Sequence, residues 1–228
     1  MLVQPGAGTC AHGRTKPPRN PQLSTLNTAR RGLLIALAAL AGCTAAPLSA
    51  PPPPASAMAG RSDELRVLVF RGGTAARLGH NHVLRAGDLR VAWPAAGPVL
   101  RFRLDALAVD PPAVRARLGP AFGSAMDDEA RAGTRANLLK ALDAAAHPEV
   151  VVRTLQQVGE GGQRAVEAEI TLHGVKRNQW FTVDVEGTRA RGQVVVRQSD
   201  FGIQPFTVLG GLLAVQDALV VQFELAQP

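Results

Sequence analysis

The stretch that decides the fold runs from Arg164 to Gly187 and reads RAVEAEITLHGVKRNQWFTVDVEG. Apolar and polar side chains alternate in both halves of this stretch, and a period of two is typical of a β-strand with one buried face. The expected buried faces are Val166, Ala168, Ile170 and Leu172 in the first half, and Phe181, Val183 and Val185 in the second. The stretch therefore predicts two antiparallel strands that each show one side to water.

Three further segments show the same alternation. They are ELRVLVF (64–70), VLRFRLDAL (99–107) and ALVVQFEL (218–225). Their expected buried faces are Leu65, Val67 and Val69; Leu100, Phe102 and Leu104; and Leu219, Val221, Phe223 and Leu225. Because these strands do not alternate with helices, the pattern indicates an all-β fold and not a βαβ fold.

One region breaks the period of two. Residues 123–150 carry Ala130, Thr134, Leu138 and Leu142 four apart, which predicts a helix that ends at His147-Pro148. Ser124 and Asp127 resemble a capping box at its start. A shorter helix is expected in PAVRARLG (112–119). The sequence thus predicts a helical insertion between strands.

We expect the strands to form an antiparallel closed barrel, because closure leaves no sheet edge exposed. The inward faces hold mainly aliphatic side chains with single phenylalanines, and the chain contains no tyrosine. A small barrel has either a packed interior or a ligand cavity. The shortage of bulky side chains favours a cavity for an apolar ligand.

Residues 1–43 have the features of an export signal. Arg30 and Arg31 precede an apolar run at 32–42, which is too short for a comfortable membrane span and has the order of regions of a secretory signal. The run ends in LAGC (40–43), which resembles the bacterial lipobox and makes Cys43 the expected lipidation site. With Thr44 in the next position, the resemblance suggests a periplasmic lipoprotein anchored to the outer membrane. The alternative is an ordinary signal peptide cleaved near Ala50, with Cys43 lost.

The rest of the chain divides into a tether and one domain. Residues 44–60 are proline-rich and are expected to form a semi-rigid spacer, and residues 61–228 are expected to form the barrel. Cys10 and Cys43 are the only cysteines, so the barrel has no disulfide and no thiolate ligand. Of the net charge of +7, only +2 lies outside residues 1–43, which argues against nucleic-acid binding.

Several segments resemble the YceI-like family of lipocalin-like, polyisoprenoid-binding proteins of the bacterial envelope. The most specific is RQSDFGI (197–203), followed by a glycine-containing loop and AVQDALVV (214–221). The segments that agree with it in order and spacing are TLHGVK (171–176), HPEVVVRT (147–154) and GHNHVLRAGDL (79–89). The resemblance covers about residues 64–226. The doubled histidine and the helical region depart from the usual pattern, as in a divergent member.

The resemblance implies a lipocalin-like barrel whose lumen binds a long isoprenoid tail, of a polyprenyl or quinone-like lipid, without catalysis and without a cofactor. Each methylene moved out of water contributes roughly 0.8 kcal/mol, so a dry aliphatic tube needs no reactive group to bind such a tail. The candidate lining residues are Leu100, Phe102, Leu104, Ile170, Leu172, Phe181, Val183, Phe201, Phe206 and Phe223. Plain core packing is the alternative role for each of them. Phe201 and Phe206, in particular, either gate the mouth of the barrel or anchor a surface loop.

His80 and His82 form the second candidate site. On one strand the two imidazoles would share a face about 6.6 Å apart and could chelate one ion, as in a metal- or haem-associated redox protein. A third ligand would have to come from His147, His173 or Asp88, and spacing selects none of them. We favour the interpretation that the pair bonds loop backbone or meets a lipid headgroup. No nucleophile motif, P-loop or Rossmann pattern occurs, so no enzyme is predicted.

Overall fold

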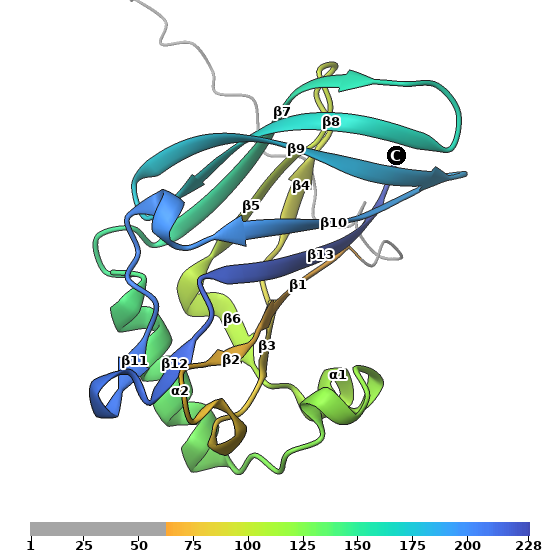
Figure 1. Cartoon of the computed structure of the whole chain (residues 1–228). Helices are drawn as coiled ribbons and strands as arrows, with labels where there is room; N and C mark the ends of the chain where they lie inside the picture. Colours follow the sequence, from red (N-terminus) through yellow and green to blue (C-terminus); the bar gives the residue numbers. More distant parts are fainter. Residues whose placement is uncertain (1–62) are drawn as a thin grey trace, which may run out of the picture. The chain divides into compact units, whose positions relative to one another are not determined.

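A computed structural model describes residues 63–228, and its main feature is one strongly curled antiparallel sheet (Figure 1). In sheet order its ten strands are β4 (Arg90–Ala92), β5 (Val99–Arg103), β7 (Glu149–Val158), β8 (Gln163–Leu172), β9 (Val175–Glu186), β10 (Arg189–Arg197), β13 (Ala218–Ala226), β1 (Glu64–Val69), β3 (His82–Ala86) and β6 (Leu107–Val109). The predicted all-β, antiparallel fold is confirmed. The predicted signal peptide, Cys43 and the tether at 44–60 lie outside the described residues.

The two ends of the sheet belong to one bent hairpin. β4 continues β3 after a bend at 87–89, and β6 continues β5 after the 3-10 turn Leu104–Ala106. β3 pairs with β6 and β4 pairs with β5, while β3 also pairs with β1 and β5 with β7. The strand pairing therefore runs round the barrel through this hairpin, although β4 and β6 do not pair with each other. Leu104, predicted as part of a straight strand, lies in the bend.

Gly87 fits this bend because the two arms of the hairpin approach closely there. Its N–H donates to the carbonyl of Ala106 at 3.2 Å, and a Cβ on residue 87 would lie 2.4 Å from that oxygen. Such a contact is far inside the normal van der Waals distance, so a side chain at this position would push the arms apart.

The predicted helical insertion is confirmed between β6 and β7. It comprises α1 (Pro112–Arg117), the 3-10 turn Pro120–Phe122 and α2 (Asp128–Ala141). The side chain of Asp127 accepts a hydrogen bond from the Ala130 N–H at 2.8 Å, so Asp127 is the N-cap and the capping box expected at Ser124 is wrong. α2 ends at Ala141, before the expected stop at His147-Pro148. No helix among residues 63–228 is long and apolar enough to cross a membrane.

The segment Ser199–Ile203 closes one end of the barrel. Phe201 and Ile203 are 2% and 1% exposed and belong to the main hydrophobic core. Gly202 has a φ of 71°, a conformation that glycine adopts without strain. The N–H and the hydroxyl of Ser199 both donate to the carboxylate of Asp217, at 2.8 and 2.7 Å, and these hydrogen bonds lower the pKa of Asp217. The turn is therefore tied to the start of β13 through its serine and to the core through its phenylalanine.

A small second sheet lies beside this end. It consists of β2 (Arg71–Gly72), β12 (Leu213–Val215) and β11 (Thr207–Val208), with β12 in the middle. It connects the chain after β1 with the loop that follows Ser199–Ile203, so that Phe206 and Val215 reach the barrel interior.

Candidate functional site: a cavity inside the barrel

A cavity of about 550 Å³ occupies the inside of the barrel. All five predicted inward faces line it, which confirms the orientation that the alternation gave to each strand. The candidate residues in its wall are Leu100, Phe102, Leu104, Ile170, Leu172, Phe181, Val183, Phe206 and Phe223. The interior is therefore hollow and mainly aliphatic, although binding of a ligand there stays a prediction.

Phe201 and Phe206 have different positions. Phe206 lines the cavity and is 37% exposed, which places it at an opening. Phe201 is buried in the core and does not line the cavity, and its carbonyl lies 3.1 Å from Nδ1 of His173. Of the two roles expected for these residues, Phe206 has the position of a gate and Phe201 that of an anchor.

The cavity is wide because small residues face the large ones. Ala168 and Ala190 are in its wall, and Gly192 lies opposite Phe223 in the β10–β13 register. The rings of Phe181 and Phe223 meet edge to face with centroids 5.9 Å apart. The Phe223 ring lies against Gly192, and the two rings do not fill the lumen completely.

Helix α2 closes part of the wall, which the sequence did not predict. Thr134, Asn137, Leu138 and Ala141 line the cavity from one face of this helix. The helical spacing of Thr134, Leu138 and Leu142 was the available signal. The sequence did not show which surface this face of α2 packs against, because that surface is formed only once the bent hairpin has folded.

A group of polar side chains lines the cavity near the start of β8. The register places Gln157 and Arg164 near the end of β7 and the start of β8, away from Leu172, and both line the cavity together with Thr154. Arg164 continues the inward series of Val166, and its Nε is buried without a hydrogen-bond partner in the described residues. This cation was missed because the apolar alternation was read only from Val166 onward.

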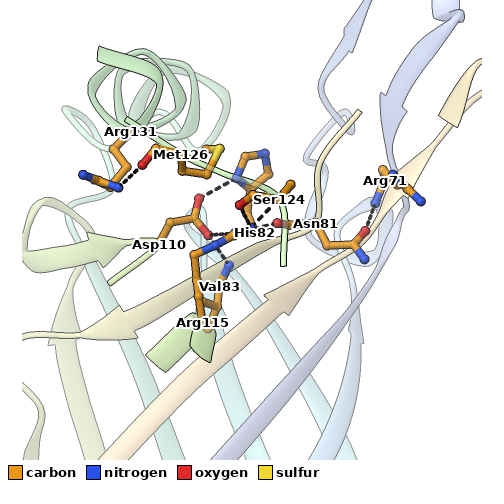
Figure 2. A network of polar contacts seen from close by, with 9 residues as sticks. All are labelled: Arg71, Asn81, His82, Val83, Asp110, Arg115, Ser124, Met126 and Arg131. Carbon is orange, nitrogen blue, oxygen red and sulfur yellow. Dashed lines mark hydrogen bonds and ion pairs between the residues drawn. The ribbon is translucent and has the colours of Figure 1, made fainter. Parts of the chain in front are cut away.

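His82 lines the cavity and is held by a buried network (Figure 2). Its Nδ1 lies 2.6 Å from Oδ2 of Asp110, and the Asp110 side chain is 0% exposed. Oδ1 of Asp110 accepts hydrogen bonds from the Val83 N–H at 2.9 Å and from Nη1 of Arg115 at 2.6 Å. Every oxygen of this carboxylate therefore has a partner.

Arg115 completes the network from α1. Its guanidinium also donates to the carbonyl of Asn81, at 2.9 Å, and to the carbonyl and hydroxyl of Ser124, at 3.0 and 2.9 Å. The Asn81 side chain accepts from the Arg71 N–H and donates to the Ala121 carbonyl. The GHNH segment is thus fixed on both sides of His82. Asn81 makes the contacts with loop backbone that were expected of the histidines, while the His82 side chain bonds to Asp110.

The charges in this network balance. Burial alone would raise the pKa of Asp110, but the hydrogen bonds from His82, the Val83 N–H and Arg115 outweigh burial and hold the pKa below its ordinary value. Asp110 is therefore a carboxylate at neutral pH and acts only as a hydrogen-bond acceptor. Asp110 also has a φ of 50°, a backbone conformation that aspartate tolerates better than most residues.

The histidine pair does not form a joint site. His80 is exposed in the loop before β3 and does not line the cavity, whereas His82 is directed at Asp110 and the lumen. The three possible third ligands are engaged elsewhere: Asp88 accepts from the Arg103 N–H, and the rings of His147 and His173 pack against each other. Among residues 63–228, no group of three or more His, Cys, Asp or Glu side chains is arranged to hold a metal ion.

A match to a family model agrees with the resemblance found in the sequence. Residues 120–226 match the model of the YceI-like domain. Among solved structures, BcnA of Burkholderia cenocepacia is similar at 12% identity with a TM-score of 0.47, covering 73% of this chain and 96% of BcnA. The YCEI protein of Campylobacter jejuni is similar at 11% identity with a TM-score of 0.41, covering 64% of this chain and 84% of that protein. No curated protein matches the sequence.

Most of the network around His82 precedes the matched range. Asp110, Arg115 and the GHNH segment all precede residue 120, whereas β7 to β13 and the Ser199–Ile203 turn lie within the matched range. The matched range thus includes the part of the cavity wall formed by β7 to β10 and β13, together with the Ser199–Ile203 turn. Residues 120–226 are thus similar to the YceI-like domain, which agrees with the resemblance that the motifs carry.

Proposed function

We propose that this barrel binds one isoprenoid-type lipid in its lumen and carries it in the cell envelope. The observation that supports this most directly is the hollow interior of about 550 Å³, lined by aliphatic side chains from every long strand. This volume lies within the range of about 300–1,000 Å³ that is usual for ligand pockets. YceI-like proteins are known to bind lipids of this class, which supports the same ligand.

The physical basis of binding is burial of the prenyl tail. Roughly 0.8 kcal/mol for each methylene removed from water is sufficient for tight binding without a reactive group. The wall includes polar side chains such as His82 and Arg164, but most of its residues are apolar. A purely structural barrel with a packed interior does not fit this arrangement.

We further propose that the protein acts by binding and not by catalysis. The Asp110–His82 pair has the form of a catalytic dyad, but no serine, threonine or cysteine among residues 63–228 is hydrogen-bonded to His82. A nucleophile within hydrogen-bond reach of the base is the mark of such catalysis.

The direct test is chemical extraction of the protein purified from a bacterial host. Organic extraction followed by mass spectrometry should yield an isoprenoid lipid in a ratio approaching one per chain. The delipidated protein should then bind a prenyl lipid in a fluorescence titration. Absence of lipid in the extract, together with no binding afterwards, would refute the proposal.

Envelope attachment is proposed through Cys43, and it has its own test. Metabolic labelling with palmitate should mark the wild type and not Cys43→Ser. An unlabelled mature form that begins near Ala50 would show instead that the signal peptide is cleaved in the ordinary way.

A further inference from the structure

We infer that His82 presents an unprotonated Nε2 to the cavity and there accepts a hydrogen bond from a hydroxyl of the bound lipid. The ligand class is therefore an isoprenoid with a hydroxyl head, either a prenyl alcohol or a quinol, and the corresponding quinone binds less well. This inference rests on the proposed lipid binding and adds the chemistry of the head.

The first step is the position of the proton on the ring. A neutral imidazole has one N–H donor and one acceptor nitrogen, and the partner of one nitrogen decides which is which. Oδ2 of Asp110 lies 2.6 Å from Nδ1 of His82, and an ionised carboxylate can only accept. Nδ1 therefore carries the hydrogen, and Nε2 keeps its lone pair.

The second step is the charge of the ring. Arg115 already neutralises Asp110 through Nη1 at 2.6 Å, and the Arg115 side chain is only 8% exposed. The carboxylate therefore does not require a second positive charge beside it. In a neutral ring, which this pairing of one cation with one carboxylate allows, the second nitrogen keeps its lone pair.

The third step is where Nε2 points. Figure 2 shows the second ring nitrogen on the side of the imidazole away from Asp110. The only side-chain hydrogen bond of His82 to the described residues is the one through Nδ1. The His82 side chain is 18% exposed and is part of the cavity wall. Nε2 is thus the acceptor that the wall offers at this point.

A hydroxyl group matches this acceptor, and a quinone carbonyl does not. A hydroxyl can donate to Nε2, whereas a carbonyl oxygen would face the lone pair with one of its own. A buried hydrogen bond of this kind changes affinity by about tenfold. Thr134 and Asn137, which line the same cavity, offer further polar groups to a head with more than one oxygen.

The test compares three ligands with the same prenyl tail on the delipidated full chain: a quinol under anaerobic conditions, its quinone, and the hydrocarbon without a head. The wild type should bind the quinol about tenfold more tightly than the quinone. A prenyl alcohol measured against the hydrocarbon shows whether a single aliphatic hydroxyl is sufficient. In His82→Leu the ratio of quinol to quinone affinity should fall to about one.

Asp110→Asn provides the sharpest comparison. The amide oxygen can still accept from Val83 and Arg115, while the amide nitrogen takes the place of Oδ2 and donates to Nδ1. The ring hydrogen must then move to Nε2, so the preference should invert in favour of the quinone. Because this variant alters a buried charge and can lose its fold, nitrogen-15 chemical shifts of the wild-type imidazole give a second measurement, and they should show hydrogen on Nδ1.

The outcomes separate this inference from the proposed function. If none of the ligands binds, including the hydrocarbon, both fail. If all bind but the wild type does not prefer the quinol, or if the nitrogen-15 shifts place the hydrogen on Nε2, only the role of His82 is refuted.

Discussion

The ring of Phe223 lies against the backbone of Gly192 so closely that a Cβ on residue 192 would come within 2.5 Å of the ring's Cζ. The same Cβ would lie 3.0 Å from the carbonyl oxygen of Thr182 on β9. The two residues are cross-strand partners in β10 and β13. The lack of a side chain at Gly192 therefore leaves the space that the Phe223 ring occupies in the cavity wall.

Gly192→Ala should push the Phe223 ring into the lumen, destabilise the fold by about 1–3 kcal/mol and weaken lipid binding. Urea unfolding and a lipid titration measure the two effects. Gly133→Ala is the matched control, since nothing lies within 4 Å of a Cβ at that helix position, and it should stabilise α2. Phe223→Leu should rescue binding in the Gly192→Ala background. Unchanged binding in Gly192→Ala itself would show that Phe223 does not border the ligand.

The orientation of strands was predictable because it is a local property. A side chain two residues away points to the same face, so the alternation in Val166–Leu172 was sufficient to place Ile170 in the lumen. The network around His82 was not predictable, because Asp110 follows β6, Arg115 lies on α1, and both reach His82 only through the β3–β6 pairing. Nor could Phe201 and Phe206 be told apart, since a loop has no periodicity to separate a buried ring from one at an opening.

Ile170→Asp should abolish lipid binding, whereas Ile170→Val should retain it. Ile170 is 5% exposed in the cavity wall, and an unpaired carboxylate there costs several kcal/mol in an apolar environment. Thr171→Asp, one residue along on the outer face, controls for the added charge. A folded Ile170→Asp protein that bound lipid as well as the wild type would disprove the assignment of the lumen. Circular dichroism establishes whether each variant is folded.

Phe201→Ala and Phe206→Ala should affect different quantities. Loss of the buried Phe201 ring should cost roughly 3–5 kcal/mol of unfolding free energy, because it leaves a hole in the core. Phe206→Ala should change stability little but should speed ligand exchange, measured by stopped-flow displacement. If Phe206→Ala leaves the exchange rate unchanged, the ligand enters elsewhere, for example near Arg164.

Asp110 should stabilise the fold in a defined pH range. Its pKa is lowered below the ordinary value of 3.8, so its contribution is present above about pH 3.8 and is lost as the pH falls through the lower folded-state pKa. The difference in unfolding free energy between wild type and Asp110→Asn should therefore have its largest value at pH 5 and should decrease below pH 3.8. Denaturant titrations across this range measure it. A difference that grows on acidification would contradict the assigned direction.

Removing Arg115, the cationic partner of Asp110, should lower the free energy of unfolding more than neutralising Asp110 itself. Arg115→Met leaves the buried carboxylate without its cation, and breaking such a pair costs roughly 3–5 kcal/mol. Combining Arg115→Met with Asp110→Asn should recover part of that loss, because no unpaired charge then remains. The double-mutant cycle fails to support the network if the two effects simply add.

A metal chelator should leave the melting temperature unchanged. In the structure Nδ1 of His82 is bonded to Asp110, and His80 is exposed outside the cavity, so the two imidazoles do not face one ion. The purified full chain should therefore hold no stoichiometric metal or haem after dialysis. A true two-histidine site would bind through neutral rings, would weaken below about pH 6, and would lose most of its affinity with either histidine. Zinc, copper or haem iron retained at one per chain, and lost in His82→Ala, would make the metal-associated role the better account of the GHNH segment.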